Sequence, residues 1–353
     1  MSDNATPLFI VSGNRSGDLD SLISSYVKAE LIRRKAPAGE VYPIRYFSDN
    51  NWKLHRDAWF LMEQCGADPD RFVSIDVVPA LSKGRDVNLY LTDHNTPEKE
   101  LSGFRDCIVE IVDHHRVSDS LPENIRCRVE NTGSSSTLLA EELLSEVENN
   151  PRFFPEKILK SLCEMLYFTI RMDTDHLTDR EQYNLDKDHW VLGKLKHFVK
   201  KNDDFTALIQ AKKDDFSSFS VEDFLEKDFK LWFLPSLTYG MSTIHGDIEK
   251  FFQLFGPTVD TAAPFMKKNK LDVLFLMHFV KAPILKRELT VICSEHCAFK
   301  DKLAEGIEDS GLFLKQKRGS REYFRYFQNN PHLSRKKIQP FINDLLINIT
   351  EDD

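Results

Sequence analysis

The sequence predicts an α/β protein whose N-terminal part is a doubly wound, mostly parallel sheet. Short, continuous apolar runs, such as residues 7–13, are typical of strands that are buried on both faces of a sheet. These runs alternate with segments that carry apolar residues at helical spacing. Asp18, Asp93 and Asp113 each follow an apolar run. They would therefore lie at the carboxyl edge of the sheet, where such folds bind ligands.

The expected elements follow one another in order along the chain. We expect strands at residues 7–13, 40–47, 72–78, 88–95 and 106–115, and helices at residues 20–35, 53–66, 134–147 and 155–174. The first helix ends in basic residues, which the helix dipole favours at that end. The second helix ends at Gly66, and serines open the third.

A change of character near residue 185 predicts a second domain. The chain becomes charged and helical there, with a Ser-rich break at residues 216–220. We expect a catalytic domain at residues 1–195, a boundary region at 196–215 and a smaller α/β domain at 216–353. Within the latter we expect two adjacent strands, perhaps as a hairpin, and then a loop that leads into a short amphipathic helix. These are residues 271–280, 287–294 and 334–350.

Composition limits the function classes. With 353 residues, 41% of them hydrophobic, and 26 phenylalanines, the chain can bury a sizeable core. A net charge of −9 argues against nucleic acid or an anionic membrane as partner, although a local cation or basic cluster can still attract an anionic substrate.

Missing sequence signals predict the compartment. No apolar run approaches the roughly 20 residues of a membrane span, and no secretory signal is visible. The six cysteines form no C-x-x-C pair, which indicates reduced thiols in a cytoplasmic protein. A zinc site at Cys293 and Cys297 is disfavoured because no second ligand pair accompanies them.

Five short stretches carry the candidate chemistry. They are GNRSGDLDS with Asn14, Asp18 and Asp20, LYLTDHN with Asp93, IVDHH with Asp113, His114 and His115, ENTGSSSTLL with Ser134 and Ser135, and TIRMDTDHL with Asp173. Carboxylates with imidazole suit Mn²⁺ or Mg²⁺, with Co²⁺ as a further option. Four or more carboxylates at one strand edge would repel one another unless cations lay between them.

Each stretch also has a purely structural interpretation. A D-x-D in a loop is usually a turn or a helix cap, Asp173 could be a helix-end aspartate, and the serines could be an N-cap, although their N–H groups would also suit a phosphate. Two adjacent histidines after a buried strand are more specific. The metal hypothesis depends on the order and spacing of all five stretches together.

The combination of D-x-D, T-D-H-N, D-H-H, G-S-S-S and M-D-T resembles the DHH phosphoesterase superfamily. The later LEKDFK and SRKKIQPFI are similar to the DHHA2 domain of its pyrophosphatase and exopolyphosphatase branch. GNRSGDLDS and LTDHNTP look most like the eukaryotic exopolyphosphatases. The resemblance implies a phosphoanhydride hydrolase that acts through a hydroxide activated by two metals, with its active site in the cleft between the two domains.

The resemblance also implies residue roles. Asp18 would bind one metal and Asp20 the other, Asp93 and Asp173 would bridge the pair, and His114 would complete the second metal. Asp113 would orient the histidines and His115 would face the phosphate. Substrate phosphates would be bound by Asn14, Arg15, Ser134, Ser135, Lys230, Arg335 and Lys336. Without the first-domain motifs, SRKK would be interpreted as a solvated basic patch. A basic track for a long polyanion could be extended by Arg15, Lys315, Lys317, Arg318, Arg321 and Arg325.

Asn14 separates the branches of the superfamily. Pyrophosphatases usually carry histidine at this position, whereas exopolyphosphatase-like members share the asparagine. We therefore expect removal of terminal orthophosphate from inorganic polyphosphate, by a monomer or weak oligomer in the cytoplasm or a polyphosphate-storing organelle. The alternatives are an inorganic pyrophosphatase or a short-chain polyphosphate or nucleoside-tetraphosphate hydrolase, a DHH nuclease or cyclic-dinucleotide phosphodiesterase, and an inactive scaffold. The sequence shows no GGGH-like stretch of the nuclease type.

Overall fold

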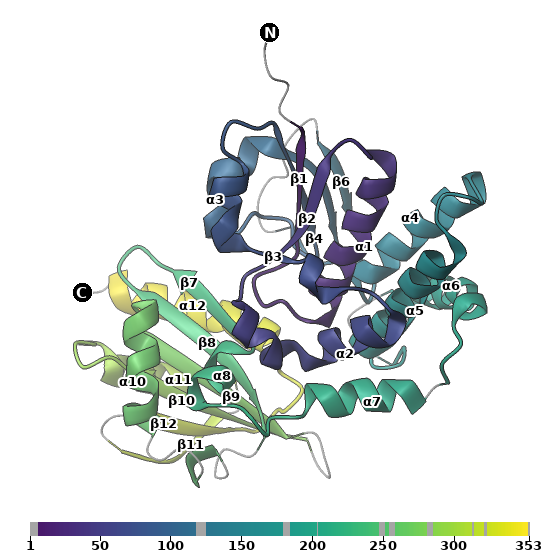
Figure 1. Cartoon of the computed structure of the whole chain (residues 1–353). Helices are drawn as coiled ribbons and strands as arrows, with labels where there is room; N and C mark the ends of the chain where they lie inside the picture. Colours follow the sequence, from purple (N-terminus) through teal and green to yellow (C-terminus); the bar gives the residue numbers. More distant parts are fainter. Residues whose placement is uncertain are drawn as a thin grey trace. The chain divides into compact units, whose positions relative to one another are not determined.

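The computed structural model describes residues 6–117, 125–178, 184–202, 204–246, 251–253, 258–280, 285–312, 314–320 and 323–351. The chain divides into two compact units, Met1–Asp215 and Phe216–Asp353. Within the described residues, each unit is built on one six-stranded sheet (Figure 1).

The sheet of the first unit is parallel throughout its described strands. Its order is β3-β2-β1-β4-β5-β6, and each neighbouring pair runs in the same direction. The strands are β1 (Leu8–Ser12), β2 (Glu40–Arg45), β3 (Val73–Ser74), β4 (Val87–Thr92), β5 (Ile108–Asp113) and β6 (Arg126–Val129). The chain leaves β1 towards β2 on one side and later returns to β4 on the other. The predicted doubly wound sheet is therefore confirmed, with its switch point between β1 and β4.

Two strands differ from the prediction. The strand expected at residues 72–78 is limited to Val73–Ser74, because Ser74 caps a 3₁₀ turn and Pro79 starts a short helix. Strand β6 was not predicted. Its residues are RCRV at one end of the sheet order, and they do not form an apolar run.

Helices cover both faces of this sheet (Figure 1). The larger core contains apolar residues of α1, α2, α4, α5, α6 and α7, and the smaller one joins the opposite strand face to α3 and η4. These helices are α1 (Leu19–Lys35), α2 (Arg56–Cys65), α3 (Val78–Leu81), α4 (Ser135–Asn149), α5 (Glu156–Asp173), α6 (Asp186–Leu195) and α7 (Asp204–Lys213). The 3₁₀ helices are η1 (Asp49–His55), η2 (Pro69–Arg71), η3 (Ile75–Val77), η4 (Lys99–Cys107) and η5 (Lys196–Phe198).

The expected boundary region is helical. Residues 196–215 contain η5 and α7, and α7 packs against α2 within the first unit. Gly66 ends α2 as predicted, with a left-handed φ of 73° that glycine adopts without a steric penalty. No described helix is both long enough and apolar enough to cross a membrane.

The second unit has a mixed sheet in the order β11-β12-β10-β9-β8-β7. Its described neighbours are antiparallel except for the parallel pair β8 and β9. The strands are β7 (Phe229–Phe233), β8 (Thr238–His245), β9 (Val273–Val280), β10 (Lys286–Cys293), β11 (Leu314–Ser320) and β12 (Tyr323–Gln328). The predicted adjacent pair is confirmed as β9 and β10, while residues 281–284 of its connection lie outside the described residues.

The helices of this unit are α8 (Val221–Glu226), α10 (Thr258–Asn269), α11 (Lys300–Glu308) and α12 (Arg335–Glu351). The expectation of a loop and a short helix at residues 334–350 is wrong, because α12 begins at Arg335 and extends for 17 residues. Its buried residues, Ile338, Ile342, Leu346 and Ile349, recur at helical spacing along nearly its whole length. They pack into the core on one face of the sheet.

Candidate metal centre

Acidic and histidine side chains gather at the carboxyl edge of the first sheet, beside its switch point. Asn14 and Asp18 follow β1, Asp93 follows β4, and His114 follows β5. Because β1, β4 and β5 are neighbours in the sheet, these loops emerge side by side. The sheet order thus brings together residues that are about a hundred positions apart in the sequence.

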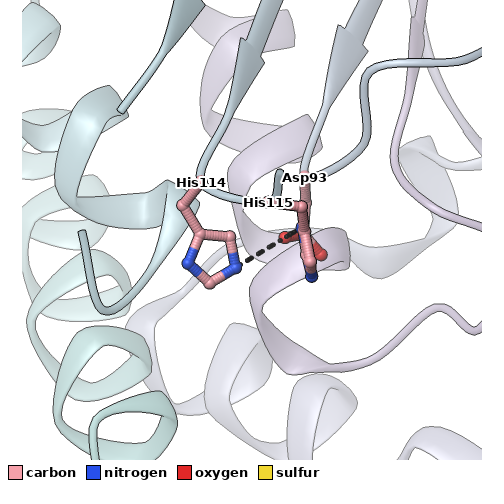
Figure 2. Close-up of side chains that lie close together, drawn as sticks. All are labelled: Asp93, His114 and His115. Atoms are coloured by element: carbon pink, nitrogen blue, oxygen red, sulfur yellow. Dashed lines mark ion pairs between the residues drawn. The ribbon is translucent and has the colours of Figure 1, made fainter. Parts of the chain in front are cut away.

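His114 belongs to two groups of residues whose ligand atoms lie within 4.8 Å of one another. One group contains Asp93 and His115, and the other contains Asp20 and Asp173. Figure 2 shows the His114 ring directed at the Asp93 carboxylate, with 3.4 Å between Nε2 and Oδ1. His114 Nδ1 lies 3.0 Å from the carbonyl oxygen of Thr132. That bond turns Nε2 towards the carboxylates, which is how a metal-binding imidazole is usually held.

The pKa shifts of Asp93 and His114 reflect the crowding of carboxylates in this cluster. Burial raises the pKa of Asp93 well above its usual range, and the charges of Asp20 and Asp18 raise it further. Burial alone would lower the pKa of His114, but its bond to Asp93 and the charges of Asp93, Asp173 and Asp20 raise it well above the ordinary value. Both shifts follow from several carboxylates lying close together in a buried place, which is an arrangement that divalent cations would stabilise.

Asp93 has a strained backbone. Its φ is 62°, which is unusual for a residue other than glycine, and its N–H donates to the carbonyl of Val112. Asn14 Nδ2 donates to Asp93 Oδ2 at 2.6 Å, and Ser135 Oγ donates to Oδ1 at 3.3 Å. These contacts aim the carboxylate into the cluster.

The orientation of Asn14 is fixed by its own loop. Its Oδ1 accepts hydrogen bonds from the backbone N–H and the hydroxyl of Ser16, at 2.9 and 2.5 Å. With the amide oxygen occupied there, the amide nitrogen faces Asp93. In this structure Asn14 therefore positions Asp93.

The aspartates of D-x-D have separate structural tasks. Asp18 is exposed and caps α1, where its Oδ1 accepts from the N–H of Ser21. Gly17, with φ at 58°, allows the tight turn before it. Asp20 is buried and accepts four bonds at the start of α4. The donors are Ser134 Oγ at 2.8 Å, Ser135 N at 2.7 Å, Ser136 N at 2.9 Å and Ser136 Oγ at 2.5 Å.

Ser134 and Ser135, which the sequence analysis expects to bind substrate phosphate, hold carboxylates of the cluster in this structure. Both are fully buried, and they donate hydrogen bonds to the carboxylates of Asp20 and Asp93. The N-terminus of α4 thus binds an anion, as the serines indicated, and that anion is a side chain of the protein.

Asp113 holds the histidine pair. Its Oδ1 accepts from the backbone N–H of His114 at 2.8 Å, from that of His115 at 3.1 Å and from His115 Nδ1 at 2.9 Å. Its Oδ2 accepts from Asn95 at 2.6 Å. Burial would raise the pKa of Asp113, but the bonds and charges of the histidines outweigh burial and lower it to about 2. Asp113 is therefore an ionised anchor, and its bond to Nδ1 directs the opposite edge of the His115 ring away from it.

The remaining predicted residues of the first unit lie around this cluster. Asp173 ends α5, is exposed and joins the group with Asp20 and His114. Arg15 is exposed and pairs with Glu100, a contact of small energetic weight.

A cavity of about 300 Å³ opens beside the histidines. Arg116, Val117, Val129, Glu130 and Asn131 also line it.

The predicted basic residues of the second unit are at the start of β7 and of α12. Lys230 is half-buried in β7, and Lys336 is exposed in α12. Arg335 donates to both the backbone carbonyl and the carboxylate of Asp228, at 2.5 and 2.6 Å.

The basic track is not borne out at Arg325. This residue is buried and pairs with Glu288 at 3.3 Å, so it offers no exposed charge to a long polyanion. The side chains of Lys315, Lys317, Arg318 and Arg321 lie outside the described residues.

Sequence reasoning missed several residues that support the cluster. Ser136 and Asn95 lie in stretches that were singled out, so a search for donors beside each aspartate could have found them. Asp188 gave no local signal. It is fully buried in α6, accepts from the N–H of Gly133 and the hydroxyl of Thr137, and so anchors the loop before α4.

Comparison with known proteins identifies the family of each unit. The model of the DHH family, N-terminal domain, matches residues 8–170, and the model of the DHHA2 domain matches residues 206–345. A human protein named Exopolyphosphatase PRUNE1 is 27% identical over 355 residues, covering 96% of this chain and 76% of its own length. A protein of Schizosaccharomyces pombe named Putative exopolyphosphatase is 25% identical over 364 residues, covering 97% of this chain and 92% of its own.

A solved structure has the same fold. It is that of a putative family II inorganic pyrophosphatase from Methanococcus jannaschii, with a TM-score of 0.65 and 16% sequence identity over 95% of this chain and 98% of that one. The two family models together account for both structural units. The chain therefore belongs to the DHH phosphoesterase superfamily, with a DHH domain followed by a DHHA2 domain.

Proposed function

We propose that the protein is a metal-dependent exopolyphosphatase that releases orthophosphate from the end of inorganic polyphosphate. The observation that carries this proposal is the convergence of Asp20, Asp93, His114 and Asp173 at one sheet edge, with His115 beside them. The proposal is supported by the names of the human and Schizosaccharomyces pombe relatives, which are both exopolyphosphatases in name. It is also supported by Asn14, which resembles that branch.

The residues present fit divalent cations. Carboxylate oxygens and one imidazole suit Mn²⁺ or Mg²⁺. Burial, and then the charges of Asp20 and Asp18, raise the pKa of Asp93, and a bound cation would counter both effects. Asp18 and Asp20 would each bind one of two cations, Asp93 and Asp173 would bind both, and His114 would complete the second. When bound, such cations would acidify a water molecule and neutralise phosphate oxygens.

The protein's own residues would hold and orient these groups. The serines of α4 fix Asp20, and Asn14 fixes Asp93, so the carboxylates are in place before the substrate arrives. His115, oriented by Asp113, would donate a hydrogen bond to a phosphate oxygen. Lys230, Arg335 and Lys336 would bind further phosphate oxygens, and Asp228 would keep the guanidinium of Arg335 oriented.

Phosphate release provides the test. Pyrophosphate, tripolyphosphate and long-chain polyphosphate are each incubated with the protein in Mg²⁺, Mn²⁺ or EDTA. We expect release from tripolyphosphate and longer chains in either metal and none in EDTA. A clear preference for pyrophosphate would overturn the substrate, and full activity of an Asp93→Ala variant would overturn the metal site.

A further inference from the structure

A second cavity lies in the first unit, between η1, α2 and α7. It measures about 360 Å³, which is at the lower end of the range for small-molecule sites. Figure 1 shows α7 alongside α2, as their packing requires. None of the residues that line this cavity belongs to the metal centre. The lining comprises the aromatic residues Trp52, Trp59 and Phe60, the basic residues Lys53, Arg56 and Lys212, and Glu63.

The lining combines aromatic rings with basic side chains, which suits a ligand that has both a flat ring and a negative charge. The three aromatic rings are half-buried, so part of each ring is accessible from the cavity. Trp52 and Trp59 meet at 69° with their centroids 5.1 Å apart, and Lys212 Nζ lies 5.6 Å from the centroid of the Phe60 ring. The rings provide flat apolar walls, and the cations provide partners for anionic oxygens.

The charge of this cavity is opposite to that of the whole chain. Three basic residues face one acidic residue in the lining, and Arg56 also pairs with Asp215, whereas the chain carries a net charge of −9. A cavity of this kind recognises a planar ring by stacking and a phosphate by charge-assisted hydrogen bonds. Its size excludes a polymer.

We propose that this cavity is a binding site for a mononucleotide, a planar base joined to a phosphate. The base would stack on Trp59 or Trp52, and the phosphate would bind to Lys53, Arg56 and Lys212. This assignment is independent of the proposed exopolyphosphatase activity, because it uses none of the metal-centre residues.

The cavity is also connected to the loop that carries Asp18. The Trp52 ring meets the Phe47 ring edge-on at 4.9 Å, and Phe47 stacks on His55 at 4.0 Å. A Cβ added to Gly17 would lie 3.1 Å from Phe47 and 3.3 Å from His55. The stacked rings therefore lie directly beside Gly17, the residue before Asp18. A ligand that moves Trp52 would therefore alter the Asp18 loop, and its binding would be coupled to metal binding.

Calorimetric titration of the whole protein with AMP tests the site. EDTA in the buffer keeps phosphate groups from binding through a metal, so the result does not depend on the proposed function. We expect saturable binding of AMP, with adenosine and orthophosphate each at least tenfold weaker. Trp59→Ala and Lys212→Ala should each weaken AMP binding roughly tenfold.

A matched pair on α6 serves as the control, because Lys194 Nζ lies 5.8 Å from the ring centroid of Trp190. Trp190→Ala and Lys194→Ala should leave AMP binding unchanged. Lys212 is exposed, so its replacement leaves the fold intact even if Trp59→Ala destabilises it. No AMP binding, or equal binding by the Lys212→Ala variant, would overturn the site.

The coupling has its own measurement. Mn²⁺ affinity is determined with and without saturating AMP, in wild type and in Phe47→Leu. We expect a several-fold change in wild type and a smaller change in the variant. The same Mn²⁺ affinity with and without AMP would overturn the coupling.

Discussion

Replacement of Asp113 by asparagine tests whether one buried carboxylate organises the histidine pair. The side chain is fully buried and accepts four hydrogen bonds, three of them on one oxygen. An amide of the same shape has only one accepting oxygen, and its NH₂ group would face either the histidine N–H groups or the Asn95 amide. At least one buried donor would then lose its partner.

The magnitude follows from the pKa of Asp113, which is lowered from 3.8 to about 2. At 1.36 kcal/mol per pKa unit, the fold favours the charged form by roughly 2 kcal/mol. Because the folded pKa is the lower one, this stabilisation is present above pH 3.8 and is lost as the pH falls towards 2. We therefore expect Asp113→Asn to lower the free energy of unfolding at pH 7 by about 2 kcal/mol.

The same substitution should disturb the metal centre through the histidine pair that Asp113 holds. Asp113 accepts from the backbone N–H of His114, the proposed metal ligand, and the loss of such a supporting contact typically lowers metal affinity roughly 10- to 100-fold. Urea unfolding and Mn²⁺ titration measure the two effects, with Asp76→Asn in an exposed turn as the control. Wild-type stability together with wild-type Mn²⁺ affinity would refute the reasoning.

Three further changes test other parts of the structure. Asn14→His places an imidazole beside Asp93 and should raise Mn²⁺ affinity several-fold in a titration, because imidazole is a better ligand for this metal than an amide. Weaker Mn²⁺ binding by the variant would contradict this. Ser136→Ala removes a hydroxyl bond to buried Asp20 and should lower the free energy of unfolding by about 1 kcal/mol, whereas Ser145→Ala on the exposed side of α4 should not. Burial, and to a lesser degree the charge of Arg325, lowers the pKa of His278 from 6.5 to about 3. The folded state therefore favours the neutral ring, and the contribution of His278 to the free energy of unfolding is fully present above pH 6.5. It falls by up to about 1.4 kcal/mol per pH unit below that. His278→Phe should flatten that fall in urea unfolding at pH 4 to 7, and an unchanged slope would contradict it.

The first sheet could be predicted from the sequence because its strands are buried on both faces. Burial makes a strand continuously apolar, so residues 7–13 and 88–95 stood out clearly. Strand β6 is at one end of the sheet order and has the sequence RCRV, which gives no such signal. The helix α12 was underestimated because its charged start was interpreted as a loop, although its apolar spacing continues to Ile349.

The members of the candidate centre were easier to predict than the groups that support them. Aspartates and histidines in the five motifs can be recognised in the sequence because their residue types are those of metal ligands. The structure brings four of these proposed ligands together, namely Asp20, Asp93, His114 and Asp173. Asp188 acts from a helix more than fifty residues after the loop that it anchors. Only the packing of α6 against α4 and α5 reveals such a contact, because neither spacing nor composition marks it.

The two aspartates of D-x-D show what the structure adds to an argument from charge. The gathering of four or more carboxylates at one strand edge led to the expectation that cations must lie between them. In the structure the first, Asp18, satisfies the start of its own helix, and the second, Asp20, is held by four donors at the start of α4. Protein donors therefore offset much of the repulsion at Asp20. Asp93 has fewer donors and a raised pKa, so it is the carboxylate at which a bound cation would change the charge balance most.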